Sequence, residues 1–176
     1  MIQEQLIKAA KQRNPKALEQ LFQESYPVLF GYLMKATLNE DIARELTQET
    51  FLKALKNIES FKEKSKFTTW LVSIATNLHK DMLRKRKHEN PKTPFDSLAF
   101  DESAEERVME KDSFARVKSV LMNLPVEKRR IFILKHYYNY TYEEISRIEN
   151  CPIGTVRSRL HDCIKKIRSE MEAETI

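Results

Sequence analysis

Glycine and cysteine are scarce in this chain, which has 176 residues and contains two of each. Tight hairpin turns need glycine at positive φ, so this composition disfavours a β-rich fold and favours a helical one. Cys151 and Cys163 stand apart, without the CxxC or Cys/His grouping of a metal site. We therefore expect two reduced thiols in a cytosolic protein, with no metal and no cofactor.

Long apolar runs and catalytic motifs are also missing. No stretch approaches the roughly 18 apolar residues of a membrane span, and Gln3, Glu4 and Lys8 interrupt any apolar core of an N-terminal leader. There is no glycine-rich phosphate loop, and the histidines are scattered among polar neighbours: His79, His88, His136 and His161. These absences argue against membrane insertion, against a small-molecule substrate and against an enzyme.

Charge is distributed in blocks, although the formal net charge is only +5. Residues 80–92 hold six Lys or Arg against two acids, and residues 126–168 hold ten against five. Between these basic blocks, residues 96–112 hold seven acids against two basic residues. One basic block would suit a membrane surface as well as nucleic acid, but two suggest a ligand that is contacted at two places.

The first half of the sequence predicts four helices, with the ranges 3–12, 15–37, 39–58 and 67–88. Asn14 and Pro15 fit the N-cap and the first position of the second helix. The third helix is expected to bury an apolar stripe made of Ile42, Leu46, Phe51, Leu52, Leu55 and Ile58. Residues 61–66 are polar and aperiodic, which predicts a loop.

A linker is predicted after these helices. Asn90 to Ser97 has two prolines and no periodicity, and the acidic block follows it. The predicted fold is all-α, with two small helical domains at 1–90 and 106–176 and a linker at 91–105.

The second domain is predicted to contain a helix up to Asn123, which a capping box of Ser103 and Glu106 begins. Pro125 begins the next helix and Asn139 closes it, with Ile131, Phe132, Leu134 and Tyr138 expected to be buried. A second capping box, Thr141 with Glu144, begins a short helix. The last helix follows Asn150-Cys151-Pro152 and buries Ile153, Val156, Leu160 and Ile164.

Two short helices joined by such a turn predict a helix-turn-helix. The outward face of its second helix would hold Thr155, Arg157, Ser158, Arg159, His161 and Asp162. An arginine fork can bind guanine O6 and N7 together, and serine is small enough to let the helix approach DNA. On charge alone, an amphipathic helix with a solvated basic face is the better explanation of this pattern. The complete arrangement of capped helix, short turn and Arg/Ser/Arg favours the DNA-binding interpretation.

Aromatic residues gather around the loop of the first domain, where Phe61, Phe67 and Trp70 stand beside lysines. Single-stranded DNA needs stacking surfaces for its bases and cations for its backbone. For Phe67 and Trp70 a place in the hydrophobic core is the better explanation. Phe61 lies at a helix end, and a role in binding is more open to it. Asn77, one turn from Ile74, can reach the same pocket.

The whole pattern resembles a known family. DIARELTQETFLKALKNIESFKEKSKFTTWLVSIATNLHKDMLRKRK, residues 41–87, resembles region 2 of bacterial sigma factors. LPVEKRRIFILKHYYNYTYEEISRIENCPIGTVRSRL, residues 124–160, resembles region 4. With the short linker, the chain resembles the extracytoplasmic-function group. The resemblance implies an alternative sigma factor in the bacterial cytoplasm that binds core RNA polymerase and promoter DNA. It also implies regulation by an anti-sigma factor.

The resemblance also implies three sets of contact residues. Core polymerase would be bound by Asp41, Glu45, Leu46, Gln48, Glu49, Phe51 and Leu52. The −10 element would be bound, with one base flipped out, by Phe61, Lys62, Lys64, Ser65, Lys66, Asn77, Arg84, Lys85 and Arg86. The −35 duplex would be bound by Tyr142, Thr155, Arg157, Ser158, Arg159, His161 and Lys165. Of these, Arg157, Ser158 and His161 would face bases and Tyr142 would lie near phosphate.

Three positions depart from the family pattern. Ser146 stands where alanine is frequent, and Asp162 stands where a basic residue is frequent. An acid on a DNA-facing helix repels phosphate, although it could accept a hydrogen bond from cytosine N4. The loop at 61–66 has no glycine, which affects the expected preference for the −10 base.

Two other functions fit parts of the sequence. A stand-alone helix-turn-helix regulator would use only the C-terminal domain, with residues 1–90 serving for an effector or for dimerisation. A helical accessory protein that binds RNA or single strands would use the aromatic loop.

Overall fold

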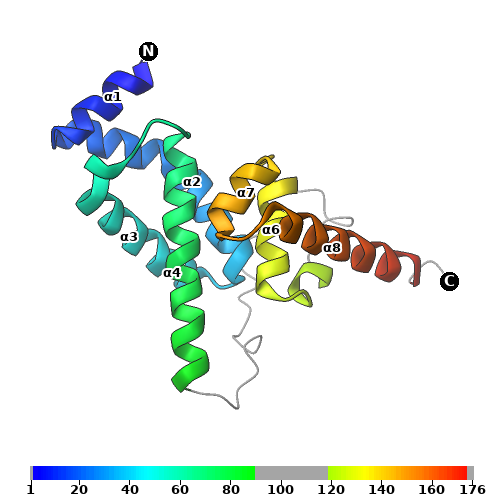
Figure 1. Ribbon diagram of the computed structural model, residues 1–176. Coiled ribbons are helices and arrows are strands. Elements are labelled where there is room, and N and C mark those ends of the chain that lie inside the picture. Colours follow the sequence, from blue (N-terminus) through cyan, green and yellow to red (C-terminus); the bar gives the residue numbers. More distant parts are fainter. Residues whose placement is uncertain (1, 90–118, 174–176) are drawn as a thin grey trace. The chain divides into compact units, whose positions relative to one another are not determined.

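The structure is a computed structural model that describes residues 2–89 and 119–173. All regular structure in these two ranges is helical (Figure 1), which confirms the all-α prediction. The chain divides into two compact units, one with most of the N-terminal helices and one with the C-terminal helices. The predicted linker at 91–105, the Ser103 capping box and most of the helix before Asn123 lie outside the described residues. No described helix is long and apolar enough to cross a bilayer.

The N-terminal unit is built from four α-helices and a 3-10 turn. Their bounds are α1, Ile2–Lys11; α2, Pro15–Thr37; α3, Glu40–Asn57; η1, Ile58–Ser60; and α4, Phe67–Glu89. The Asn14 side chain accepts a hydrogen bond from the Ala17 amide at 3.2 Å, and Pro15 is the first helical residue. Both sequence predictions for the start of α2 are therefore confirmed.

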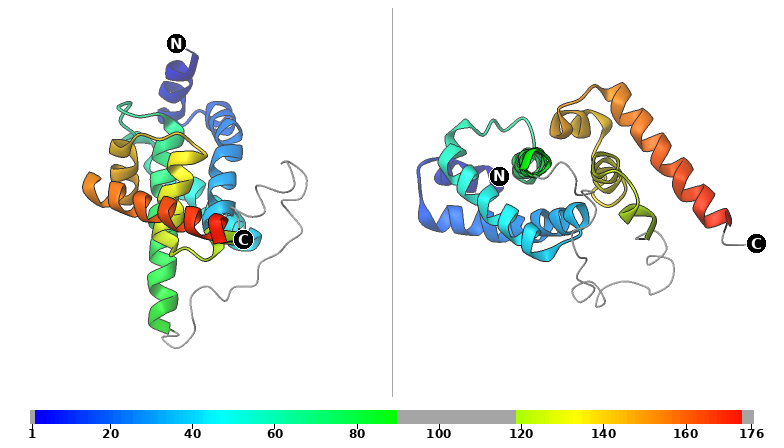
Figure 2. Two further views of the ribbon diagram at one scale, coloured as in Figure 1. Left: turned by 90° about the vertical axis from the view of Figure 1, so that its right-hand side faces the viewer. Right: turned by 90° about the horizontal axis from the view of Figure 1, so that it is seen from below.

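Stacked aromatic rings and a buried polar contact help to hold these helices together. Figure 2 shows α2 and α3 running beside each other, with α4 crossing them. The Phe22 ring of α2 stacks on Phe51 of α3, with 4.6 Å between centroids, and lies 6.5 Å from Phe67 of α4. The hydroxyls of Tyr32 and Thr76 lie 2.7 Å apart in the buried interior between α2 and α4.

The stripe predicted on α3 is only partly buried: Phe51 and Leu55 are half-buried, and Leu52 is misplaced. Leu52 is 58% exposed, because it lies two residues, or about 200° of helix rotation, beyond the buried Thr50. Small residues complete the buried face instead, with Thr47 and Ala54 beside Thr50. The hydroxyls of Thr47 and Thr50 donate to the carbonyls of Ala43 and Leu46 at 2.7 and 2.6 Å, which satisfies these polar groups inside the unit.

The C-terminal unit contains three α-helices and, at residues 119–122, the end of a further helix. Their bounds are α6, Val126–His136; α7, Tyr142–Glu149; and α8, Ile153–Ala173. The prediction that α6 continues to Asn139 is wrong, since the chain turns after His136 and Asn139 adopts a φ of 53°. Tyr138 is consequently half-buried rather than buried, whereas Ile131, Phe132 and Leu134 are buried as predicted.

A buried ion pair lies in the core of this unit, where α6, α7 and α8 pack together. Nε and Nη2 of Arg130 on α6 donate to Oε1 and Oε2 of Glu149 on α7 at 2.7 and 3.0 Å. The side chains are 0% and 1% exposed. Cys163 of α8 is also buried, and burial raises the pKa of its thiol to about 11. The Arg130–Glu149 ion pair fixes α7, the first helix of the helix-turn-helix, against α6.

Candidate nucleic-acid interface

The helix-turn-helix begins with the predicted capping box. The Thr141 hydroxyl accepts a hydrogen bond from the Glu144 amide at 3.2 Å. The Glu144 carboxylate accepts one from the Thr141 amide at 2.8 Å. These reciprocal bonds satisfy two backbone donors that a helix start otherwise leaves open, and they confirm the prediction for α7.

The turn between α7 and α8 is held by backbone and side-chain bonds. Asn150 is left-handed, with a φ of 50°, and its amide donates to the carbonyls of Ser146 and Arg147. The Ser146 hydroxyl donates to the Cys151 carbonyl at 2.6 Å. This bond gives Ser146, a departure from the family pattern, a physical role, because it fastens the turn that leads into α8.

The outer face of α8 is polar and open. Arg157, Ser158, His161 and Lys165 are exposed, and Thr155 and Arg159 are half-buried. Gly154 is exposed too, and a Cβ placed on it would meet no atom within 4 Å. The fold therefore does not require glycine at that position, although glycine in a helix costs stability relative to alanine.

Two cations from different helices meet on one tyrosine. The Tyr142 ring at the start of α7 has Lys135 Nζ 4.9 Å from its centroid and Arg157 Cζ 5.6 Å from it. The ring's negative faces attract both charges. Lys135 also donates to the Tyr140 carbonyl at 3.3 Å. The contact orients the Arg157 side chain before any ligand is bound.

Asp162 is directed toward α6. Its carboxylate accepts a hydrogen bond from Lys128 Nζ at 2.8 Å. This bond and the charge of Lys128 hold the pKa of Asp162 below its ordinary value. Since the carboxylate is neutralised within the unit, the acid fastens α8 to α6 instead of standing as a free negative charge on the outer face.

In the N-terminal unit, residues 61–66 form the predicted loop between η1 and α4. Lys62, Lys64 and Lys66 are exposed, and Ser65 is half-buried. The prediction that Phe61 is open to binding is wrong for this structure. Its side chain is 2% exposed, and its ring packs 5.4 Å from Phe67 and 5.2 Å from Trp70. Phe61 anchors the loop to the core because all three rings remove apolar area from water.

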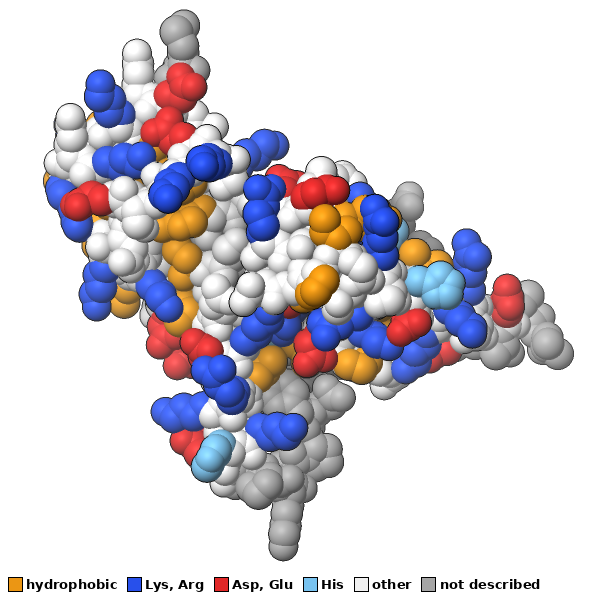
Figure 3. Space-filling model, viewed as in Figure 1, with side chains coloured by type: hydrophobic (Ala, Val, Ile, Leu, Met, Phe, Trp, Pro, Cys, Tyr) orange, Lys and Arg blue, Asp and Glu red, His pale blue; other side chains and the backbone are white. Residues whose placement is uncertain are grey.

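The predicted residues of α4 follow the same helix. Asn77, Arg84 and Lys85 are exposed, and Arg86 is half-buried. Arg84 pairs with Asp81 at 2.9 Å. Figure 3 shows basic side chains gathered around the C-terminal end of α4. Positive charge there also favours the helix dipole, so the position stabilises α4 whether or not DNA is bound.

An acidic and partly apolar face runs along α3. Five of the residues predicted to bind polymerase are exposed on it: Asp41, Glu45, Gln48, Glu49 and Leu52. Leu46 is 2% exposed and belongs to the core, so its predicted contact with a partner is wrong for this structure. Phe51 is half-buried under Phe22.

Sequence reasoning missed Tyr26 of α2, which lies next to this face. It is 41% exposed, and its ring stacks 5.4 Å from Phe30 and lies 6.5 Å from Phe51. Periodicity gave no signal for it, since Tyr26 lies three residues from Leu29 and seven from Leu33, a spacing that predicts burial on the same stripe. An exposed aromatic ring beside other rings is a candidate contact residue.

Comparisons with known proteins agree with both units. The family model for sigma-70 region 2 matches residues 21–89, and the model for sigma-70 region 4 matches residues 114–167. The ECF RNA polymerase sigma factor SigW of Bacillus subtilis is 30% identical over 151 residues, which covers 80% of each chain. EcfG of Rhodopseudomonas palustris is 31% identical over 147 residues, 84% of this chain and 78% of that one.

A solved structure has the same fold along most of the chain. The sigma factor RpoE of Bartonella quintana, in complex with the anti-sigma factor NepR, gives a TM-score of 0.75 at 25% identity. The match covers 89% of this chain and 98% of that one. A stand-alone regulator is not favoured, because it would leave the region 2 match unexplained. The chain therefore belongs to the ECF sigma factors, the alternative sigma factors that direct transcription initiation by RNA polymerase.

Proposed function

We propose that α8 enters the major groove of the −35 element and reads base edges with Arg157, Ser158 and His161. The observation that carries this proposal is the Tyr142 ring, which holds Arg157 and Lys135 together at the edge of the outer face. A pre-oriented arginine loses less freedom when it forms a bidentate contact with guanine. Thr155, Arg159 and Lys165 then lie beside the backbone, where phosphate contacts set the register.

The N-terminal unit binds the −10 element as a single strand in this proposal. Lys62, Lys64 and Lys66 attract its phosphates, and Ser65 and Asn77 offer hydrogen bonds to a flipped base. Arg84, Lys85 and Arg86 extend the basic surface along α4. Flipping a base costs a few kcal/mol, which backbone attraction and hydrogen bonds must offset.

Core polymerase binds the face of α3 with Asp41, Glu45, Gln48, Glu49 and Leu52, and Tyr26 extends this face. Exposed Leu52 and Tyr26 support the proposal, because large hydrophobic side chains left at the surface are candidates for protein contacts. The carboxylates add charge complementarity to a basic partner surface.

Regulation and location follow from the proposed partners. The relative from Bartonella quintana was solved with an anti-sigma factor, and we propose that a protein of this kind also binds this chain. Sigma factors are non-catalytic subunits, so no enzymatic activity is proposed for it. A protein that works on core polymerase and promoter DNA belongs in the bacterial cytoplasm. The domain limits proposed for these roles remain 1–90 and 106–176, with a linker at 91–105.

Run-off transcription with purified core polymerase tests this function. The templates are genomic fragments, including the region upstream of the protein's own coding sequence. We expect a defined transcript that requires both core polymerase and this chain. If no fragment gives a promoter-dependent transcript, the proposed function fails. Stable binding to promoter duplex without polymerase would instead favour a stand-alone regulator.

Asn77→Ala isolates the role of Asn77 in strand opening. We expect open complexes, measured by permanganate reactivity of −10 thymines, to fall about tenfold because a contact to the flipped base is lost. Binding to core polymerase, measured by native gel or fluorescence anisotropy, should stay unchanged. His88→Ala, at an exposed site near the end of α4, is the matched control. Loss of polymerase binding in the Asn77 variant would contradict the assignment.

A further inference from the structure

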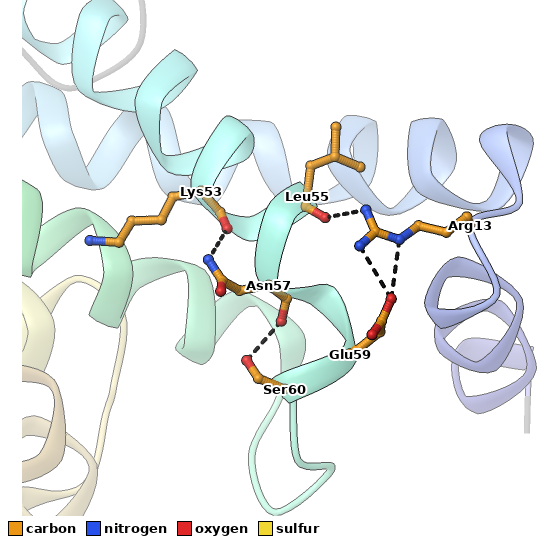
Figure 4. A network of polar contacts seen from close by, with 6 residues as sticks. All are labelled: Arg13, Lys53, Leu55, Asn57, Glu59 and Ser60. Carbon is orange, nitrogen blue, oxygen red and sulfur yellow. Dashed lines mark hydrogen bonds and ion pairs between the residues drawn. The ribbon is translucent and has the colours of Figure 1, made fainter.

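The junction between α1 and α2 contacts the end of α3 and the 61–66 loop. Arg13 lies in this junction with a φ of 64°. Its Nη1 donates to the Leu55 carbonyl at 2.9 Å, and its Nε and Nη2 donate to Glu59 Oε1 at 3.3 and 3.2 Å (Figure 4). Lys11 Nζ pairs with Glu63 Oε1 at 3.3 Å and lies 5.7 Å from the Phe61 ring centroid.

These contacts fix the end of α3 and the 3-10 turn η1 that leads into the loop. Leu55 is in the last turn of α3, where carbonyl groups lack helical partners and attract cations. The Asn57 side chain donates to the Lys53 carbonyl at 2.8 Å, and the Ser60 hydroxyl donates to the Asn57 carbonyl at 2.7 Å. Figure 4 shows Arg13 approaching this end of α3 from a different part of the chain. The start of the loop is therefore held from two sides.

The same contacts pair the two acids at and next to the loop and leave its three lysines exposed. Residues 58–66 contain the acids Glu59 and Glu63 and the exposed lysines Lys62, Lys64 and Lys66. Each acid is paired with a cation from outside the loop. An unpaired carboxylate a few residues from a phosphate contact would lie within the screening length of about 8–10 Å and would repel the strand. Because both acids are paired, the three lysines determine the charge that the loop presents to DNA.

We propose that Lys11 and Arg13 are positioning residues for single-strand binding, which neutralise Glu63 and Glu59 and so make the loop positive toward DNA. This inference rests on the proposed −10 role of the loop. The two cations precede residue 21, where the match to sigma-70 region 2 begins. The end of the N-terminal helix and the junction after it, which precede the matched residues, thus contribute to a loop that lies within the match.

The test uses holoenzyme made with the full chain and a promoter found in the run-off assay. The probe is a fork template, duplex through the −35 element and single-stranded at −10 on the non-template strand. We expect K11A/R13A to weaken fork binding on the order of fivefold, with a smaller loss at high salt. Binding to the duplex part alone should not change. Trp70 fluorescence, measured on the chain without core polymerase, shows whether the N-terminal unit remains folded, because the chain has one tryptophan.

Removing the acids separates charge neutralisation from bracing. E59Q/E63Q also breaks both ion pairs, so a purely mechanical brace would lose as much binding as K11A/R13A does. Charge neutralisation instead predicts binding at least as tight as wild type, and recovery to within about twofold in the variant K11A/R13A/E59Q/E63Q. A quadruple variant as weak as K11A/R13A would show that the cations touch DNA themselves and would overturn the proposal.

A third variant separates this inference from the proposed function. K62A/K64A/K66A should lose more fork binding than K11A/R13A, because it removes the phosphate contacts themselves. If only this variant loses binding, the −10 role of the loop stands and the role of Lys11 and Arg13 fails. If the lysine variant binds like wild type, the −10 role of the loop fails and the inference fails with it.

Discussion

Two arginine–glutamate pairs with the same chemistry lie in opposite surroundings in the two units. Arg130 and Glu149 are 0% and 1% exposed, and Arg130 donates two hydrogen bonds of 2.7 and 3.0 Å to the Glu149 carboxylate. Arg13 and Glu59 are 51% and 69% exposed, with bonds of 3.3 and 3.2 Å. The first pair joins two helices of a core, and the second joins the junction between α1 and α2 to the 3-10 turn η1.

Burial decides what each pair does. A buried charge that loses its partner has no water to replace it, so each half of the buried pair depends on the other. An exposed charge that loses its partner is solvated by water. An exposed ion pair therefore contributes at most about 1 kcal/mol to the free energy of unfolding. The buried pair therefore stabilises the fold of the C-terminal unit, whereas exposed charges such as Arg13 and Arg157 remain available to adjust or contact a ligand.

Arg130→Met gives the largest effect that we expect. It leaves the Glu149 carboxylate buried without its partner and should lower the free energy of unfolding of the C-terminal unit by about 3–5 kcal/mol. Because the chain has two units, each needs its own probe. Urea-dependent labelling of the buried Cys163 thiol, followed by mass spectrometry, reports on the C-terminal unit. Trp70 fluorescence reports on the N-terminal unit and should not change.

A double variant, R130M/E149L, checks the cause. Replacing both charges with apolar side chains removes the unpaired carboxylate, so most of the lost stability should return. If the double variant is as unstable as Arg130→Met, packing volume rather than an isolated charge explains the loss.

Arg157→Ala should have the opposite profile, with stability unchanged and DNA reading impaired. We expect it to relax base preference in the −35 element and to cost about 1–3 kcal/mol in binding. Holoenzyme affinity for a set of −35 variants measures both effects. Arg168→Ala, an exposed site later on α8, is the matched control and should preserve base preference. Equal loss on every sequence would identify Arg157 as a phosphate contact.

The features that could be predicted from sequence depend on neighbours along the chain. Thr141 and Glu144 are three residues apart, so the spacing alone specified their reciprocal hydrogen bonds. The capped start of α2 and the loop at 61–66 were likewise local. The exposed face of α8 followed from helical periodicity.

The features that could not be predicted depend on partners distant in the sequence. Arg130 and Glu149 are 19 residues apart, and nothing in the sequence indicates that two charged residues share a core. Lys128 reaches Asp162 across 34 residues, which turns an apparent obstacle to DNA binding into a contact between helices. Phe61 was misassigned for another reason: Phe67 and Trp70 are near it in the sequence, but the sequence does not indicate that their rings pack on Phe61 and bury it.

Gly154→Ala should stabilise the fold and at the same time weaken DNA binding. Alanine should stabilise α8 by about 0.5–1 kcal/mol, since glycine costs conformational entropy in a helix and the added Cβ meets open space. In the proposed complex that space is occupied by DNA, so −35 affinity should fall while urea-dependent Cys163 labelling shows higher stability. Equal or tighter DNA binding would show that the duplex does not approach α8 at this point.

Arg13→Ala is expected to give the smallest change, and it completes the comparison of the two pairs. Alanine keeps a Cβ at the left-handed φ of 64°, so the backbone strain stays the same and only the side-chain bonds are lost. Glu59 becomes solvated, and Trp70 fluorescence in urea should show a loss below about 1 kcal/mol. Lys16→Ala, exposed in the first turn of α2, is the matched control. A loss as large as that of Arg130→Met would mean that the bond to the Leu55 carbonyl, rather than the exposed ion pair, determines how α3 ends. Exposure would then not be sufficient to distinguish arginines that stabilise the fold from those that serve the ligand.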